Sequence, residues 1–298
     1  MPVLRKAIVK SMKQIKYIRK AAPAHMVGDG FKVRTFISSA MWKDMSPFLM
    51  LDYIEPTSYL PTDHPRGVDV HPHKGFETVS ILWEGALAHE DSSGGKGKLF
   101  AGDVQWMTAG SGILHKEYHD REYSKAGGLF QMVQLWVNLP AKDKMSAPKY
   151  QAIANDQMTK VMLEDGKSYV EVIAGKFKDQ VGPAKTFTEV HLQNAILAKG
   201  IKVDFDFPAT QNTFLSVIEG SVKVNGDALV DVDHFVEMDK KGTSFNIEAT
   251  EDAKVLVASG EPIGEPIAAH GPFVMNTRDE LVQAFNDYND GKFGQLED

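Results

Sequence analysis

The sequence predicts an all-β protein, a duplicated β-sandwich or β-barrel that ends in one α-helix. Short β-rich runs, broken by Gly, Asp and Asn, follow one another from about residue 30. A hairpin pattern occurs twice, once around Glu84-Gly85 and again around Glu219-Gly220. This repeat indicates that the second half of the chain is a copy of the first.

The first unit is expected over residues 30–145. Its segment ETVSILWEGALAHED has two strand-like runs on either side of the Glu-Gly turn, which is a hairpin signal. A further turn is indicated at Gly102-Asp103, before a strand over Val104 to Met107. The run LFQMVQLWVNLP is another strand, which Pro140 ends because proline cannot donate a ladder hydrogen bond.

The second unit is expected over residues 165–298, after a polar, Pro-bearing join near 140–165. Its end differs from the rest of the chain. Thr277 and Glu280 have the spacing of a capping box, and apolar residues at 281, 285 and 288 then share one face. Gly291 follows as a stop signal. We therefore expect a helix over about 278–289 that packs against a barrel.

Composition excludes several kinds of site and partner. The chain has no cysteine, so disulfides, thiolate zinc sites and iron–sulfur clusters are excluded. A net charge of −7 opposes direct nucleic-acid binding. No apolar run approaches the ~20 residues of a membrane span, and the N-terminus lacks the apolar core of a secretory signal. We expect a cytoplasmic protein, or one that also enters the nucleus if the source is eukaryotic.

Residues 1–29 form a basic extension, with seven Lys or Arg and no acid before residue 21. Ile8, Met12 and Ile15 lie at i, i+4 and i+7, which allows a short basic amphipathic helix for targeting or for an anionic surface. A solvated terminal extension explains the same composition and is the favoured interpretation.

Two pairs of polar residues carry the chemistry of the first unit. Residues i and i+2 of a strand point to the same face, so His71 and His73 project together, and so do His115 and Glu117. Two such strands inside one small barrel bring three imidazoles and one carboxylate to a point. This donor set suits one first-row divalent ion per chain, with Fe favoured over Mn, Co, Ni, Cu or Zn, and leaves positions open for O2 or a substrate.

Other interpretations of these histidines stay open. His71 and His73 also fit polar residues at the start of a strand. Glu77 and His119 are rival ligands, whose plainer roles are to support the ligands or to face solvent. His191, His234 and His270 lie singly in the second unit, and we interpret each as structural or solvated. No separate active site is expected there.

The motifs GVDVHPHKGFETVSILWEG and GDVQWMTAGSGILHKEY resemble the two motifs of the cupin superfamily, and within it the pirin family. The segments SPFLMLDY, LFQMVQLWVNLP and the stretch 260–294 are similar to pirin segments too, so the resemblance runs from about residue 30 to 294. It implies two tandem cupin (jelly-roll-like) β-barrels, with a metal in the first only. It also implies iron ligation by His71, His73, His115 and Glu117.

The sequence departs from the pirin pattern beside this site. Lys74 stands where pirins often have Arg, and Ser111 and Lys116 stand where Arg and Ser are common. These departures put the substrate preference in question more than metal binding.

The resemblance further implies a quercetin 2,3-dioxygenase, which opens a flavonol ring with O2 and releases carbon monoxide. Glu117 would then be the catalytic base for the flavonol hydroxyl. Four apolar residues are candidates for the wall of the substrate pocket, although barrel core is the favoured role for each: Phe48, Trp106, Met107 and Phe130.

Two alternative functions do not involve a flavonol substrate. Some pirins are regulatory proteins, in which the metal changes a surface that docks a protein partner without turnover. The second alternative is a metal-dependent isomerase or another cupin enzyme that acts on a small molecule. In each case we expect a monomer.

Overall fold

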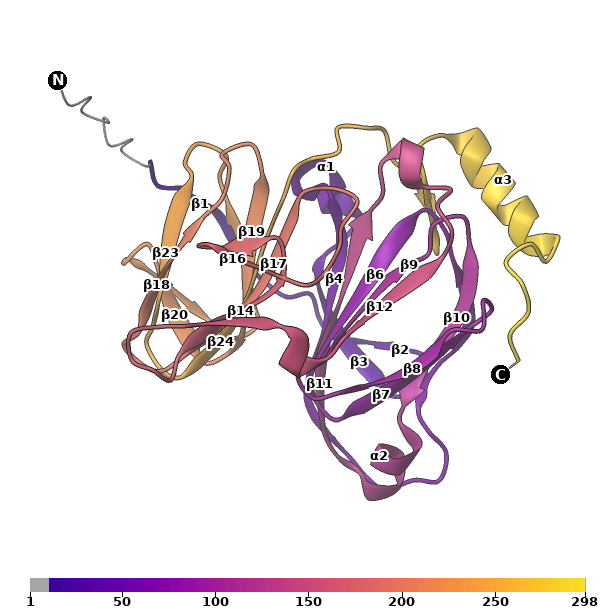
Figure 1. Cartoon of the computed structure of the whole chain (residues 1–298), viewed down its shortest axis with the longest axis horizontal. Helices are drawn as coiled ribbons and strands as arrows, with labels where there is room; N and C mark the ends of the chain where they lie inside the picture. Colours follow the sequence, from indigo (N-terminus) through magenta and orange to yellow (C-terminus); the bar gives the residue numbers. More distant parts are fainter. Residues whose placement is uncertain (1–10, 298) are drawn as a thin grey trace.

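The structure is a computed structural model that describes residues 11–297, and it contains two β-barrels side by side (Figure 1). Each barrel has one seven-stranded and one four-stranded sheet, both antiparallel. The predicted all-β architecture with two barrels is confirmed. Within the described residues, no helix has the length and apolar character needed to cross a membrane.

The first barrel contains most of the strands between residues 25 and 153. Its four-stranded sheet has the order β5 (Gly67–His73), β10 (Ile113–His119), β7 (Ala86–Asp91), β8 (Lys96–Phe100). Its seven-stranded sheet has the order β12 (Lys149–Ile153), β9 (Val104–Thr108), β6 (Phe76–Glu84), β11 (Gly128–Asn138), β4 (Phe48–Tyr59), β3 (Phe31–Ile37), β2 (His25–Val27).

The second barrel repeats this plan. Its seven-stranded sheet has the order β1 (Ile15–Lys20), β22 (His234–Met238), β19 (Asn212–Glu219), β24 (Ala253–Gly260), β17 (Val190–Leu197), β14 (Tyr169–Ala174), β13 (Thr159–Met162). Its four-stranded sheet has the order β18 (Lys202–Asp206), β23 (Ser244–Ala249), β20 (Ser221–Val224), β21 (Ala228–Asp231).

Short elements connect these strands. Two small hairpins are formed by β15 (Lys176–Phe177) with β16 (Gln180–Val181) and by β25 (Ala268–His270) with β26 (Phe273–Met275). The α-helices are α1 (Trp42–Met45), α2 (Arg121–Ala126) and α3 (Arg278–Asn289). The 3-10 helices are η1 (Ser39–Met41), η2 (Ala141–Asp143) and η3 (Asn155–Gln157).

The two seven-stranded sheets share one hydrophobic core between the barrels. A single buried cluster takes side chains from β4, β6, β9 and β11 of the first barrel and from β17, β19, β22 and β24 of the second. Phe48 and Phe214, both fully buried, meet edge to face across this core with ring centroids 5.1 Å apart. The barrels therefore hold each other through their larger sheets, which leaves the smaller sheets outermost.

The N-terminal segment joins the second barrel as a strand, so the amphipathic helix is not formed in its described part, although most side chains of that strand are exposed. β1 pairs antiparallel with β22, from Ile15 opposite Met238 to Lys20 opposite His234. The basic residues have specific partners there: Lys16 Nζ lies 2.6 Å from a Glu237 carboxylate oxygen, and the buried Lys13 Nζ donates to two backbone carbonyls. Ile8 lies outside the described residues.

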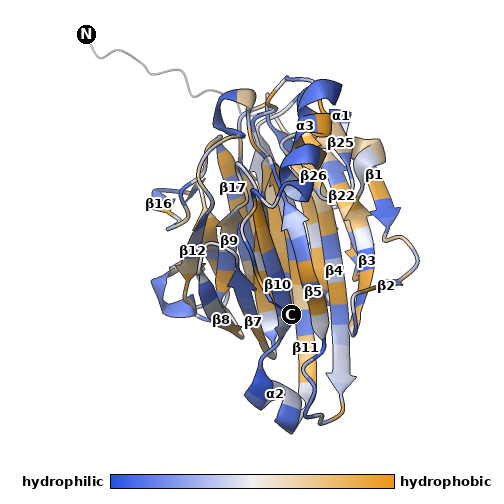
Figure 2. Cartoon of the chain, turned by 90° about the vertical axis from the view of Figure 1, so that its right-hand side faces the viewer, coloured by the Kyte–Doolittle hydropathy of each residue, from blue (hydrophilic) through white to orange (hydrophobic). Residues whose placement is uncertain are grey.

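The C-terminal segment follows the second barrel in sequence but packs against the first barrel. α3 begins with the predicted capping box, since Thr277 Oγ1 accepts from the Glu280 amide and the Glu280 carboxylate accepts from the Thr277 amide. Its apolar side packs with Phe273 and Phe293 against Leu114 of β10. Figure 1 accordingly shows α3 at the outer side of the first barrel, and Figure 2 shows β1 beside β22. We therefore propose to amend the domain limits 30–145 and 165–298. The second barrel also includes β1 from the N-terminal segment, and α3 from the C-terminal segment belongs with the first barrel.

Replacing Phe214 by Ala should lower the free energy of unfolding by about 3–5 kcal/mol, because it leaves a cavity in the core that both barrels share. Urea unfolding followed by tryptophan fluorescence measures this loss. Leu229→Ala is the control, because Leu229 is 56% exposed and should change stability little. Equal effects of the two variants would show that the shared core does not stabilise the protein as described.

Glu77 lies in the same interface and should make stability depend on pH. It precedes Val79 and Ile81 on the face of β6 that packs against the second barrel, and burial raises its pKa to about 7 although the Thr108 hydroxyl donates to it. The unfolded chain gives up this proton at lower pH, so stability should fall as pH rises from about 4.5 to about 7, by up to about 3 kcal/mol in total.

The variant Glu77→Gln removes this titration. Unfolding free energies of wild type and variant, measured by urea titration from pH 4.5 to pH 8, should therefore be closest near pH 4.5, where Glu77 is protonated, and separate as pH rises to about 7, because only the wild type loses stability. Curves that stay parallel over the whole range would contradict the raised pKa.

Candidate metal centre

Strand pairing brings three histidines together at the inner face of the smaller sheet of the first barrel. β5 and β10 lie side by side in Figure 2 and pair antiparallel, with His71 directly opposite His115 and His73 opposite Ile113. The ring centroids are 4.2 Å apart for His71 and His115 and 4.8 Å apart for His73 and His115. One ring nitrogen of each residue lies within 4.8 Å of the others. A metal ion between them would contact all three.

The protonation and hydrogen bonding of these rings suit ligation. Burial lowers the pKa of His73 and of His115 well below the usual value, so both stay neutral, as metal ligands must be. His71 Nδ1 lies 2.7 Å from the Asp69 carbonyl oxygen, which can only accept, so Nε2 keeps its lone pair. The Pro272 carbonyl of the returning C-terminal segment acts weakly in the opposite direction on the pKa of His73. His73 Nδ1 and His115 Nε2 are buried without a hydrogen-bond partner, as expected where a ligand is missing.

Glu117 lies in the same layer but is not part of the histidine cluster. Its Oε2 accepts a 2.8 Å hydrogen bond from Gln134 Nε2, and its Oε1 accepts a 3.3 Å bond from Ser80. Burial raises the pKa of Glu117, although His71, Gln134 and Ser80 act in the opposite direction. The carboxylate is thus within the cavity and held by side-chain donors. Its ligation of a metal stays a prediction.

The rival ligands lie elsewhere. Successive side chains of a strand point to opposite faces, so Glu77 of β6 lies on the same side as Val79 and faces the second barrel. His119 faces the interior of the first barrel but is enclosed by aromatic rings, with Phe130 at 4.5 Å and Tyr59 at 4.7 Å between centroids. Burial lowers the pKa of His119 to about 4. Neither residue belongs to the cluster of three histidines.

A cavity of about 230 Å³ lies beside His71, His73 and Glu117. Its polar side consists of His71, His73, Glu117, Gln134 and Asp52. The remaining wall is apolar and comes from β2, β3, β4, β5, β7 and β11: Val27, Phe31, Val33, Met50, Ile54, Val68, Leu87, Met132 and Trp136. None of the four aromatic and Met residues proposed from the sequence lines it, so for them the favoured role as barrel core is correct.

Sequence reasoning missed two residues that organise the site. Gln134 and Trp136 lie at i and i+2 of β11, and the Trp136 indole donates to Gln134 Oε1 at 3.1 Å. This bond orients the amide so that its NH2 group faces Glu117. The run LFQMVQLWVNLP looked like an apolar strand. The available signal was the side-chain amide of Gln134 and the indole N–H of Trp136, two polar groups within that run.

The three departures from the pirin pattern do not line the cavity. Lys74 is 2% exposed and its Nζ lies 2.7 Å from an Asp287 carboxylate oxygen of α3. Lys116 Nζ donates to the backbone carbonyl of Glu297. The Ser111 amide donates to the Ser146 carbonyl. Lys74 and Lys116 thus attach the C-terminal segment to the first barrel.

The second barrel has aromatic rings where the first has histidines. In the pairing of β18 with β23, Phe205 lies directly opposite Phe245, as His71 lies opposite His115 in the first barrel. The two rings stack with centroids 5.3 Å apart. This position has no donor atom for a metal, and within residues 11–297 the three histidines of the first barrel are the one group that fits an ion.

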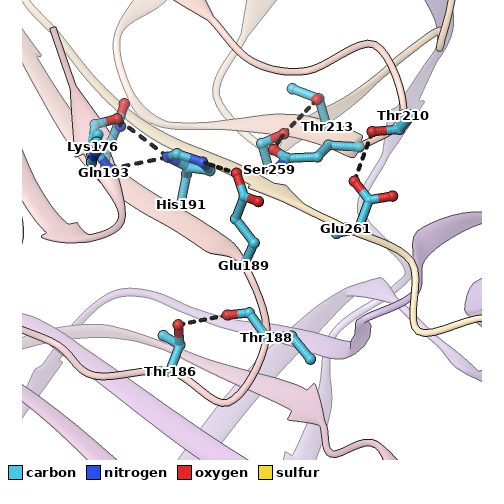
Figure 3. Close-up of polar contacts among 11 residues, drawn as sticks. Lys176, Thr186, Thr188, Glu189, His191, Gln193, Thr210, Thr213, Ser259 and Glu261 are labelled. Atoms are coloured by element: carbon cyan, nitrogen blue, oxygen red, sulfur yellow. Dashed lines mark hydrogen bonds and ion pairs between the residues drawn. The ribbon is translucent and has the colours of Figure 1, made fainter.

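His191 belongs to a buried hydrogen-bond network in the second barrel (Figure 3). Its Nδ1 accepts from the Lys176 amide at 3.1 Å, and its Nε2 faces Glu189 at 3.5 Å. His234 lies against backbone carbonyls, and the exposed His270 packs beside Phe285. These contacts are consistent with structural or solvated roles.

The chain matches two family models, Pirin over residues 30–137 and Pirin C-terminal cupin domain over residues 192–294. A relative from Pseudomonas aeruginosa with the name "Putative quercetin 2,3-dioxygenase PA2418" is 42% identical, over 95% of this chain and 99% of the relative. The protein "Pirin" of Homo sapiens is 37% identical, over 90% of this chain and 89% of its own length.

Solved structures agree with these relatives. The crystal structure of quercetin 2,3-dioxygenase from Acinetobacter baumannii superposes with a TM-score of 0.93 at 44% identity, and covers 96% of this chain and 100% of that one. The bacterial pirin YhhW from Escherichia coli, solved in complex with nickel(II), has a TM-score of 0.61 at 22% identity and covers 83% of this chain and 99% of that one, a likeness of fold alone. With both domain models matched in order and relatives aligned over nearly the whole length, the chain belongs to the pirin family of two-domain cupins.

Proposed function

We propose that this pirin is a mononuclear non-haem iron protein that cleaves quercetin-like flavonols with O2. The observation that carries the proposal is the set of three convergent imidazoles, two of them buried and neutral, at one end of an apolar cavity that also contains a carboxylate. The proposed ligands are His71, His73, His115 and Glu117. The relatives whose names include quercetin 2,3-dioxygenase support the choice of substrate.

The residues present fit such an ion. Three imidazole nitrogens with one carboxylate suit a divalent first-row metal, and the chain has no cysteine thiolate. Two of the ring nitrogens are buried and lack any other partner. A bound ion would supply Lewis-acid chemistry toward a substrate oxygen and sites for O2. Iron is the proposed metal, and Mn, Co, Ni, Cu or Zn would fit the same donors.

Glu117 is the proposed general base. A raised pKa makes a carboxylate a better proton acceptor at neutral pH, and Glu117 lies at the cavity wall where a substrate hydroxyl would enter. The proton would pass from the flavonol 3-hydroxyl to a Glu117 oxygen. Gln134 and Ser80 keep the carboxylate in position during this transfer, since each donates to one of its oxygens. Trp136 in turn prevents the Gln134 amide from turning over.

The apolar wall would bind the rings of the flavonol and exclude water. Val33, Ile54, Leu87 and Met132 face the cavity without a polar atom, so an aromatic ring can displace water there without losing hydrogen bonds. Because water is excluded, the hydrogen bonds to Glu117 are stronger than they would be in solvent. Binding and proton transfer would therefore take place in the same low-dielectric space.

A metal-dependent regulatory protein without turnover is the second candidate. The contacts of Lys74, the residue after His73, favour it: its amide donates to the Pro272 carbonyl, and its Nζ lies 2.7 Å from an Asp287 carboxylate oxygen of α3. A change at the metal would reach the surface of α3 by this route. A protein partner would then sense whether the metal is present.

The double variant His71→Ala/His115→Ala should lose the metal, because two of the three imidazoles are removed. Elemental analysis of wild type purified without chelator should give about one iron per chain, with little in the variant. O2 uptake should depend on quercetin in the wild type only. Iron without quercetin-dependent uptake would favour the regulatory candidate, and wild type without any metal would refute the site.

Gln134→Leu removes the amide that holds Glu117 but keeps the size of the side chain. Loss of this charge-assisted hydrogen bond should reduce quercetin turnover by roughly tenfold or more, in line with about 1.5–3 kcal/mol for such a bond. Steady-state O2 uptake measures the change. In a Glu117→Gln background the same replacement should have little further effect, and an undiminished effect there would mean that Gln134 acts independently of Glu117.

A further inference from the structure

We propose that the first barrel has a second binding site, on the side away from the metal, for a small neutral hydroxylated aromatic molecule. The site is a cavity of about 380 Å³ between β8 and β12. These strands are the last of the two sheets of the barrel and are not hydrogen-bonded to each other. The metal cavity opens at the opposite seam, where β5 faces β2 and β3.

Two glycines allow polar side chains to pack closely at the wall of this second cavity. Gly97 lies opposite His89 in the pairing of β7 with β8, and a Cβ there would come within 2.7 Å of His89 Nε2. A Cβ on Gly95 would overlap the Asp91 carboxylate. A side chain at either position would collide with His89 or Asp91, so the glycines let these two polar residues lie against the wall of the cavity.

The cavity wall contains buried polar atoms without partners. Gln105 is 4% exposed, and its Nε2 has no hydrogen-bond acceptor. The Tyr150 hydroxyl and Asp91 Oδ2 lie near each other beside Gly95 but form no hydrogen bond of good geometry. A buried polar group without a partner costs about 1–3 kcal/mol, and several in one place indicate a ligand that completes them.

The chemistry of these atoms selects the ligand. Gln105 Nε2 can only donate, Asp91 Oδ2 accepts, and the Tyr150 hydroxyl can do both, so the complementary group is a hydroxyl. Apolar contacts are offered by Leu99 and Ile153. His89 and Tyr150 stack with centroids 4.8 Å apart and provide an aromatic surface. Charges of both signs surround the cavity, with Lys96, Lys98 and Asp103 in its wall and the buried Asp91 beside it, so a neutral ligand is favoured over an anion.

The site is separate from the metal ligands although it is close to them. His89 and Asp91 lie on β7 directly opposite Glu117 and His115 of β10. Gln105 lies opposite Ser80, whose hydroxyl donates to Glu117. One layer of side chains thus divides the two cavities, and the proposal does not depend on dioxygenase activity.

Resorcinol is the probe, because its 1,3-hydroxyls do not chelate a metal as a catechol does. Titration into the full-length, metal-loaded protein, followed by ligand-observed NMR and calorimetry, should show saturable binding to one site. 1,3-Dimethoxybenzene, which cannot donate, should bind at least tenfold more weakly. Absence of saturable resorcinol binding would overturn the proposal and leave water as the occupant of the cavity.

Two conservative variants locate the site. Gln105→Leu and Tyr150→Phe should each weaken resorcinol binding about tenfold, while metal content and thermal midpoint stay at wild-type values. Tyr169→Phe, a matched tyrosine change in the second barrel, should have no effect. The His71→Ala/His115→Ala variant should still bind resorcinol. Loss of binding there, or unchanged binding in both cavity variants, would place the molecule elsewhere and refute the second site.

Discussion

The antiparallel pairing of β5 with β10 is the constraint on which the site depends. It places His71 opposite His115, and the two-residue period of the strand adds His73 and Glu117 to the same face. A shift of one residue would turn these side chains out of the barrel. The C-terminal segment secures this register from outside, because Lys74 exchanges backbone hydrogen bonds with residues 272 and 274 and packs against α3.

The two barrels share a plan and differ in what fills the equivalent position. Stacked phenylalanines at 205 and 245 give the second barrel a continuous apolar interior, so it contributes stability and a packing surface. The first barrel has polar side chains there, His71 opposite His115. Its larger sheet rests on the second barrel, and its smaller sheet is supported by α3. The exchange of terminal segments thus compensates for a core interrupted by a polar site.

Much of this arrangement could be predicted from sequence, for reasons that particular residues make clear. The i, i+2 spacing of His71 with His73, and the capping box at Thr277, are local patterns with one structural meaning each. Gln134 and Trp136 could not be assigned, because their role depends on Glu117 of another strand. The partners of β1 and α3 lie more than 150 residues away in sequence, and periodicity contains no information about such pairings.

The most direct test of the metal centre is anomalous diffraction at the iron edge, on crystals of protein purified without chelator. We expect one peak per chain, about 2.0–2.2 Å from a ring nitrogen of His71, His73 and His115, and none between Phe205 and Phe245. A peak at another place, or none at any transition-metal edge, would contradict the account.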